Sequence, residues 1–353
     1  MSHVDLRSAS APRRAACPVS TRPKVTLISC GGTIASAVKP GVGAMPSLDV
    51  GELARTVPGV AEAAELTSQP MRLIASPHMT LRDLLDLAAA SRDAIATGAD
   101  GVVITQGTDT IEEIAFGLDL LCAGDAPIVV TGAMRNASMA GADGPANLLA
   151  AVRVAASPLA RGLGTLVVFN DEIHAARFVR KSHSQNPATF VSQQAGRLGW
   201  LAEADVRILV RPARRYHVAV ADDAKVPAVA LLKMALGDDG RLMECLPAAG
   251  FAGCVIEGFG GGHVTREVAA PGRIERLIEA MPVAFATRSG NGELLRATYE
   301  FEGSEMDLIR RGVIYAGALD GPKARVLLAL LLMAGADRAR IAHAFADIGP
   351  LSA

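Results

Sequence analysis

Short apolar runs alternate with amphipathic segments along the chain from Lys24 onward, and no other feature restricts the fold as strongly. In the first part of the chain, the runs typical of buried strands are 25–29, 71–76, 101–106, 127–132 and 165–171. Helical patterns follow at 51–65, at 80–96 with Thr80 as a cap, from Thr110 with Glu113 at capping-box spacing, and around Asn147. Repeated strand-then-helix units predict an α/β domain with a doubly wound, mostly parallel sheet over residues 24–209.

The pattern changes at residues 210–226, a basic segment with one proline that we interpret as a linker. Beyond it, residues 227–353 repeat the alternation on a smaller scale and predict a second, smaller α/β domain. Its expected strands are 227–234, 253–260 and 282–289, and its expected helices are about 265–280, 305–315, 321–335 and 337–347. Residues 172–194 form a polar, hairpin-like stretch. Residues 1–23 lack an apolar run of signal-peptide length and predict a disordered tail.

Charge and cysteine content exclude several classes of protein. The formal net charge is -1 and the basic residues are spread along the chain, which argues against a nucleic-acid-binding surface. The five cysteines form no CxxC pair and are odd in number, as in a protein of the reducing cytoplasm. No apolar stretch reaches the roughly 18 residues that a membrane span requires, so we expect a soluble cytoplasmic protein.

Hydroxyl side chains follow several of the predicted strands. Thr33 comes after Gly31 and Gly32 at the end of the first strand, Ser76 ends the second, and Thr108 and Asp109 follow the third. A single threonine at such a place is most often a helix cap. The carboxyl ends of parallel strands share one rim, however, where open α/β sheets bind their ligands. Three hydroxyls with a carboxylate on that rim predict a catalytic site.

A threonine hydroxyl is a poor nucleophile near neutral pH and needs a base. Lys181, in the polar stretch after the fifth strand, is the candidate, although a solvated surface lysine is the commoner role for such a residue. Gly31 and Gly32 allow the backbone to approach a substrate closely, and helix-start amides can stabilise an oxyanion. The residues alone therefore indicate a threonine nucleophile with a candidate base. Because such a nucleophile belongs to the protein itself, we expect that no metal or organic cofactor is needed.

Other motifs carry less weight. The segment 258–263 is glycine-rich but lacks the GxGxxG spacing, and the chain contains no P-loop, so a nucleotide-binding enzyme is disfavoured. A tight turn near a subunit interface explains 258–263 better. The histidines show no HExxH or other metal-ligand spacing, and His78 and His343 resemble residues on helix flanks.

Two segments resemble the signatures of bacterial-type L-asparaginases. Residues 30–35 (CGGTIA) are similar to the first signature, and residues 104–113 (ITQGTDTIEE) are similar to the second. The resemblance continues through 131–135, 142–145 and 170–171, and ends with PKAR at 322–325, so it covers the chain from about Lys24 to the C-terminus. It implies a hydrolase that converts L-asparagine to L-aspartate and ammonia, with L-glutamine as a candidate second substrate.

The resemblance also implies roles for individual residues. Thr33 matches the nucleophile that forms an acyl-enzyme. Thr108, Asp109 and Lys181 match a hydrogen-bonded group that assists proton transfer, and the spacing from Asn170 identifies this lysine.

For the substrate, Gly32 and Ser76 match binding residues, with Ser76 on the α-carboxylate, and Asp109 matches the residue that binds the α-amino group. Glu305, counted back from Pro322, matches an acidic residue that a neighbouring subunit contributes in this family. The implied assembly is a homodimer or homotetramer with active sites completed across subunits.

The chain departs from the family pattern at several positions. Residues 36–48 contain no tyrosine, whereas the family usually carries one on this loop beside the nucleophile. Gln106 stands where histidine is commoner, Pro77 follows Ser76, and His263 replaces a frequent asparagine. Because the loop tyrosine is missing, a second function remains possible: a protein of the same fold that binds a small amino acid and catalyses its hydrolysis poorly. The amidase subunit of a tRNA-dependent amidotransferase is disfavoured. That subunit normally carries an extra N-terminal domain, and the tail of residues 1–23 is too short for one.

Overall fold

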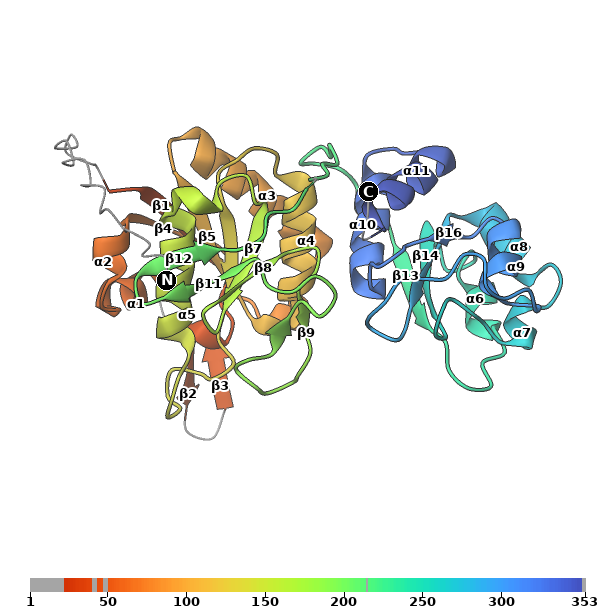
Figure 1. The fold of residues 1–353 in the computed structure, drawn as a ribbon, viewed down its shortest axis with the longest axis horizontal. Helices are drawn as coiled ribbons and strands as arrows, with labels where there is room; N and C mark the ends of the chain where they lie inside the picture. Colours follow the sequence, from red (N-terminus) through yellow and green to blue (C-terminus); the bar gives the residue numbers. More distant parts are fainter. Residues whose placement is uncertain (1–21, 40–42, 47–49, 214, 351–353) are drawn as a thin grey trace, which may run out of the picture.

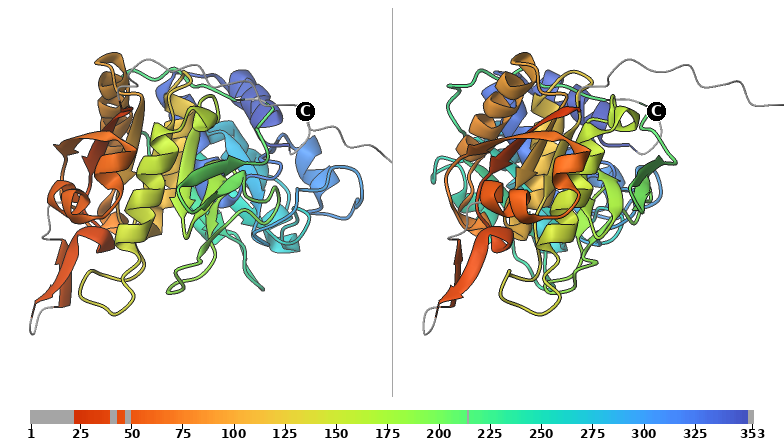
Figure 2. Two further views of the ribbon diagram at one scale, coloured as in Figure 1. Left: turned by 60° about the vertical axis from the view of Figure 1, so that its left-hand side comes forward. Right: turned by 90° about the vertical axis from the view of Figure 1, so that its left-hand side faces the viewer.

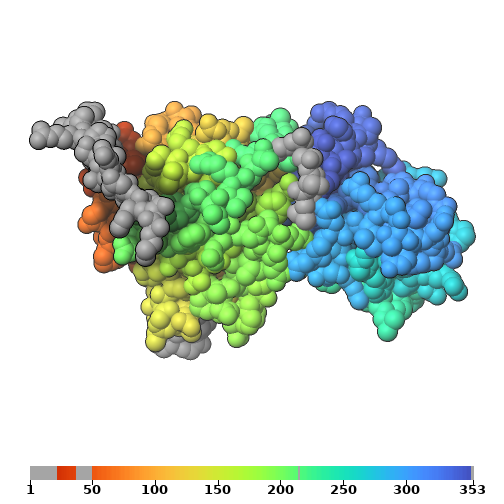
Figure 3. Space-filling view, viewed as in Figure 1, coloured from red at the N-terminus to blue at the C-terminus, as the bar shows by residue number. Residues whose placement is uncertain are grey.

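The computed structural model describes residues 22–39, 43–46, 50–213 and 215–350 (Figure 1). Figure 1 shows a larger N-terminal and a smaller C-terminal domain side by side, and in the turned views of Figure 2 the N-terminal domain lies in front. The space-filling view shows the two in contact (Figure 3). Most of the predicted tail, residues 1–21, lies outside the described residues. No helix in the described part of the chain is long and apolar enough to span a membrane.

The N-terminal domain contains an eight-stranded sheet in the order β12-β11-β8-β7-β6-β5-β1-β4. Its strands are β1 (Lys24–Ser29), β4 (Glu65–Pro70), β5 (Gly101–Thr105), β6 (Ile128–Thr131), β7 (Thr165–Phe169), β8 (Glu172–Ala175), β11 (Gly199–Ala202) and β12 (Asp205–Ile208). The five strands from β4 to β7 run parallel, and β8, β11 and β12 add an antiparallel edge. The prediction of a mostly parallel sheet is confirmed.

Helices cover both faces of this sheet because its central strands, β1, β5, β6 and β7, are buried on both sides. Val103 of β5 packs in one core with α1 (Val50–Thr56), α2 (Val60–Ala63) and α5 (Gly144–Ala156). Its neighbours Val102 and Ile104 pack in the other core with α3 (Leu81–Ala96) and α4 (Ile111–Leu121). Successive side chains of a strand point to opposite faces, so a continuous apolar run produces a doubly wound domain.

The C-terminal domain is built on a four-stranded parallel sheet. In spatial order its strands are β13 (Val229–Lys233), β14 (Gly253–Gly258), β15 (Val283–Thr287) and β16 (Ile314–Tyr315). Its helices are α6 (Arg241–Cys245), α7 (Arg266–Ala269), α8 (Arg273–Ala280), α9 (Glu305–Arg310), α10 (Gly321–Met333) and α11 (Arg338–Ile348). Figure 1 shows α10 on the side that faces α4, and apolar residues of both helices belong to one core. The two domains therefore share buried surface.

The remaining elements are short. Two hairpins, β2 (Ser36–Lys39) with β3 (Gly43–Pro46) and β9 (Arg180–Lys181) with β10 (Phe190–Val191), lie outside the main sheets. Single 3-10 turns are η1 (Thr33–Ala35), η2 (Ser76–His78), η3 (Thr108–Thr110) and η4 (Pro158–Ala160). The described residues between 209 and 226 form neither helix nor strand, which supports the proposal that they link the two domains.

Three local predictions are wrong. The strand predicted at 71–76 is β4, residues 65–70, and Leu73 within the apolar run is 50% exposed. The helix predicted at 51–65 divides into α1 and α2, because Gly59 adopts a left-handed conformation with φ 89°. Thr110 precedes α4 as expected, but its hydroxyl makes no capping bond and instead donates to the carbonyl oxygen of Ser76, 3.3 Å away.

The helix boundaries of the C-terminal domain also differ from the predictions. The segment 265–280 forms two helices, α7 and α8, because Gly272 adopts φ 78° between them. The helix predicted at 305–315 ends at Arg310 and gives way to β16. The predicted capping by Thr80 is confirmed, since its hydroxyl accepts from the Asp83 amide and the Asp83 carboxylate bonds back to the Thr80 amide.

Candidate active site

The carboxyl ends of β1 and β5 bring the two predicted threonines together. These strands pair in parallel register, and the Cys30 amide donates to the Thr105 carbonyl oxygen at 2.8 Å. Just beyond, Gly32 rests on the backbone of Gly107, so closely that a Cβ added to Gly32 would lie 2.1 Å from the Gly107 nitrogen. Thr33 and Thr108 directly follow these two glycines and therefore lie next to each other at the rim of the sheet.

Thr33 begins the 3-10 turn η1 and is partly exposed. Gly32 precedes it with φ 81° and ψ -174°, a conformation essentially restricted to glycine. Among the described residues the Thr33 hydroxyl has no hydrogen-bond partner. The hydroxyl is thus presented at the rim without being used as a helix cap.

Lys181 joins this rim from the hairpin of β9 and β10. Its Nζ donates to Thr108 Oγ1 at 2.8 Å and to Asp109 Oδ1 at 2.7 Å. The lysine side chain is 14% exposed, so the alternative of a solvated surface lysine is wrong. The hydrogen bond from Lys181 lowers the pKa of the Asp109 carboxyl, against the opposing effect of partial burial. The arrangement places an amine within hydrogen-bond distance of a hydroxyl, as proton transfer requires, with a carboxylate beside it.

Ser76 belongs to the same group, although η2 and not a strand places it there. Its Oγ lies 3.2 Å from both Asp109 Oδ2 and the Asp109 amide nitrogen. Gly107 makes this approach feasible, because a Cβ there would lie 2.6 Å from Ser76 Oγ. Ser76 is buried, whereas the Asp109 side chain is 56% exposed and remains accessible to an ammonium group.

Glu305 does not join these residues within the chain. It is fully buried in the C-terminal domain, where its Oε1 accepts from the amides of Thr298 (2.7 Å) and Tyr299 (2.6 Å). Its Oε2 lies 3.1 Å from His263 Nε2. Burial raises the pKa of the Glu305 carboxyl, but the two amide donors and His263 outweigh it and hold the pKa below its usual value.

The structure shows the surroundings of His263 and Gln106, two residues at which the sequence departs from the family pattern. His263 closes a tight turn, since the Phe259 amide donates to its carbonyl oxygen at 2.8 Å, and its ring contacts Tyr299 and Phe301 edge-on. Gln106 is fully buried and its amide nitrogen lies 3.5 Å from Thr110 Oγ1, in keeping with a structural role. The loop without tyrosine includes residues 40–42 and 47–49, which lie outside the described residues.

One residue of the site was not predicted. Glu112 accepts a hydrogen bond from the backbone amide of Lys181, with 2.7 Å between N and Oε2. The sequence shows it only as part of the second signature, and no local pattern connects it with a lysine 69 residues away. No group of three or more histidine, cysteine, aspartate or glutamate residues in the described part of the chain could hold a metal ion.

Two family models together match most of the chain. Residues 24–214 match the family model "Asparaginase, N-terminal", and residues 228–345 match "Glutaminase/Asparaginase C-terminal domain". An L-asparaginase of Bacillus licheniformis is 35% identical over 312 residues, covering 88% of this chain and 95% of its own. A probable L-asparaginase of Deinococcus radiodurans is 36% identical over 335 residues, covering 92% and 97%.

A solved structure supports the same assignment. The crystal structure of a probable cytoplasmic L-asparaginase from Campylobacter jejuni superposes with a TM-score of 0.82 at 30% identity, covering 92% of this chain and 99% of that one. The match extends over both domains, as do the two family models. The chain belongs to the asparaginase family.

Proposed function

We propose that this protein is an L-asparaginase that hydrolyses L-asparagine to L-aspartate and ammonia, with L-glutamine as a candidate second substrate. One observation carries the proposal beyond family membership. The Lys181 side-chain nitrogen bonds both Thr108 and Asp109. Thr33 follows Gly32, whose backbone rests on that of Gly107, and the Thr33 hydroxyl does not serve as a helix cap. This is a hydroxyl nucleophile next to a group that can move its proton.

In the proposed first half-reaction, Thr33 Oγ attacks the carbon of the substrate's side-chain amide. Its proton passes through the Thr108 hydroxyl to Lys181 in its neutral form, and the protonated lysine returns a proton to the leaving nitrogen. The carbon–nitrogen bond breaks, ammonia leaves and an aspartyl ester of Thr33 remains. In the second half, water attacks the ester carbon and its proton passes to Lys181 along the same path. The bond from that carbon to Thr33 Oγ breaks, the lysine returns the proton to Oγ, and L-aspartate leaves.

The substrate's charged end is expected beside Asp109 and Ser76. The exposed Asp109 carboxylate suits the α-ammonium, and the buried Ser76 hydroxyl suits the α-carboxylate. The Gly32 backbone lies where the substrate must approach Thr33. Holding the amide against the nucleophile removes most of the entropic cost of the reaction, which can contribute several kcal/mol to the rate.

We also propose a homodimer or homotetramer in which Glu305 of a second copy completes each site. Because Glu305 is fully buried in the single chain, this contribution requires that assembly uncover its carboxylate. The support is the resemblance in sequence and the match of the C-terminal family model. Dilution to monomers should then abolish turnover, as sedimentation and ammonia assays on the same samples would report. The described cysteines, all free and three of them buried, support a place in the reducing cytoplasm.

The central test compares the purified protein with Thr33→Ala. Ammonia release is measured from L-asparagine, L-glutamine and D-asparagine in parallel. We expect wild-type turnover of L-asparagine and a loss of several orders of magnitude in Thr33→Ala, with unfolding curves that coincide. Wild-type binding of L-asparagine without ammonia release would contradict the proposal.

A further inference from the structure

Lys181 is held at both ends by a single segment of the chain. Its Nζ bonds Thr108 and Asp109 in η3, and its backbone amide donates to Glu112 Oε2 at 2.7 Å. Glu112 lies in the first turn of α4, which directly follows η3. The Glu112 bond therefore fixes the start of the lysine side chain relative to the same turn that receives its end.

The strand that carries Lys181 has little pairing of its own. β9 is two residues long and pairs only with β10, which is equally short. An isolated pair of such strands is marginal in water. Phe190 of β10 is buried in the main core, and the Ser182 amide donates to the Thr189 carbonyl oxygen at 2.8 Å, so the hairpin has other supports. At Lys181 itself the backbone anchor is the Glu112 carboxylate, and charged acceptors make the stronger hydrogen bonds.

Charged groups of both domains face Glu112. Burial raises the pKa of its carboxyl, and nearby Lys323 of α10 opposes this effect most strongly, with Arg180 of β9 acting in the same sense. Asp320, which caps the start of α10, and Glu113, the neighbour of Glu112 in α4, add negative charge nearby. The residues around this carboxylate therefore come from three elements.

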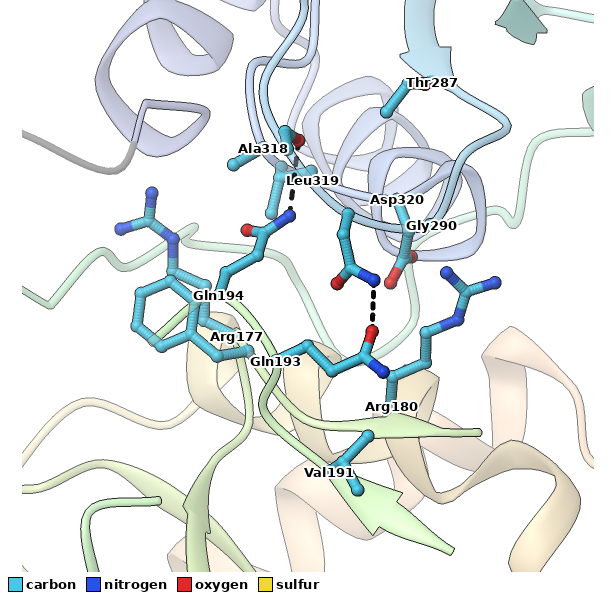
Figure 4. Close-up of a pocket in the computed structure, with 13 residues that line it drawn as sticks. Arg177, Arg180, Val191, Gln193, Gln194, Thr287, Gly290, Ala318, Leu319 and Asp320 are labelled. Carbon is cyan, nitrogen blue, oxygen red and sulfur yellow. Dashed lines mark hydrogen bonds between the residues drawn. The ribbon is translucent and has the colours of Figure 1, made fainter. Parts of the chain in front are cut away.

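The C-terminal domain holds this cluster in place. Lys323 is 1% exposed, and its Nζ bonds Asp320 Oδ2 at 2.8 Å. Figure 4 shows Arg180, the neighbour of Lys181 in β9, extending across the domain boundary toward Asp320 and Gly290. Of the two β9 residues, Lys181 thus bonds a carboxylate of the N-terminal domain through its backbone, and Arg180 places its positive charge near Asp320. Burial raises the pKa of the Asp320 carboxyl, but Lys323 and, less strongly, Arg180 hold the pKa below its usual value.

We propose that Glu112 is a positioning residue for Lys181, which holds the lysine backbone so that Nζ meets the Thr108 hydroxyl. The inference rests on the proposed function, in which Lys181 takes the nucleophile's proton. Glu112 touches neither substrate nor reacting atoms and acts through the lysine alone. Its removal lets the lysine shift while Ser76 and Asp109 keep the substrate-binding groups in place.

The test uses Glu112→Ala, Glu112→Gln and the control Glu113→Ala in the full-length protein. Misplacing a catalytic group by about 1 Å can cost about 100-fold, so kcat of Glu112→Ala should fall at least about 10-fold with KM within about 2-fold. Glu112→Gln keeps an acceptor oxygen and should recover most of kcat. Glu113→Ala removes a partly buried carboxylate of the same turn, one that makes no bond to Lys181, and should keep kcat within about 3-fold.

A second measurement separates positioning from a merely structural role. In a Lys181→Met background, Glu112→Ala should cost no further activity, because its effect runs through the lysine. Hydrogen exchange of the segment containing the Lys181 amide should accelerate in Glu112→Ala and not in Glu113→Ala. If Glu112→Ala does not fold, Glu112→Asp, which withdraws the carboxylate by one methylene, should show the same loss of kcat.

Normal kcat in Glu112→Ala, an equal loss in the Lys181→Met background, or unchanged exchange would each overturn the inference. These outcomes differ from a failure of the proposed function. That failure would appear as near-normal turnover by Lys181→Met, or as no ammonia release by the wild type, whatever residue 112 is.

Discussion

Replacing Gly32 by alanine should disable the site through the backbone alone. The added Cβ would lie 2.1 Å from the Gly107 nitrogen and 2.5 Å from the Gln106 carbonyl carbon. Ordinary contacts of this kind are about 3.4 Å or longer, so the two strand ends must separate by about 1 Å. Thr33 and Thr108 would separate with them, and a shift of that size should lower kcat/KM about 100-fold or more.

Alanine at this position also meets conformational strain. The φ of 81° with ψ of -174° costs a residue other than glycine about 1–3 kcal/mol, and the overlap adds about 1–3 kcal/mol. Two other glycines separate these contributions. Gly98 has φ 105° with nothing within 4 Å of an added Cβ, so Gly98→Ala carries strain without overlap. Gly107 has φ -72°, so Gly107→Ala carries overlap with Ser76 without strain.

The assay pairs ammonia release from L-asparagine with urea unfolding of each variant. Gly98→Ala should lose stability but keep kcat/KM, and Gly107→Ala should mainly raise KM through Ser76. Gly32→Ala should lose both stability and kcat. Its kcat is measured under conditions in which the unfolding curve shows at least nine-tenths of the protein to be folded. Near-normal kcat/KM in folded Gly32→Ala would refute the reasoning that this glycine contact sets the distance between the threonines.

Other predictions concern single side chains. Thr108→Val and Lys181→Met should each lower kcat by about 10²–10⁴, because both interrupt proton transfer, and stopped ammonia assays would show it. Ser76→Ala should raise KM for L-asparagine about 10-fold with little change in kcat, since one hydrogen bond to a charged group is lost. Burial lowers the pKa of His174 from 6.5 to about 4 in the folded protein. As the pH falls from 6.5 toward 4, the unfolded chain therefore binds a proton that the folded protein does not, and the free energy of unfolding decreases. From pH 7.5 to pH 5 this residue should account for about 2 kcal/mol of unfolding free energy, and urea unfolding of His174→Gln should lack that part of the pH dependence.

The amino-acid sequence by itself determined the architecture and, within the candidate site, the placement of Thr33 and Thr108. Continuous apolar runs such as 25–29 and 101–105 predict strands buried on both faces, and such strands fold only with helices on both sides. The parallel strands then bring their carboxyl ends to one rim. Thr33 and Thr108 meet there because each follows its strand within a few residues, so local pattern and topology suffice to place them.

Only the tertiary structure decided which residues distant in the sequence contact the site. β4 is an exposed edge strand without an apolar run, so the sequence misplaced it and put Ser76 at a strand end that does not exist. The bonds of Lys181 to Thr108 and Glu112 span 73 and 69 residues, and the shared burial of α4 and α10 is equally remote. Hydrophobic periodicity records which face of an element is buried and not which distant element covers it, so these contacts appear only in the folded chain.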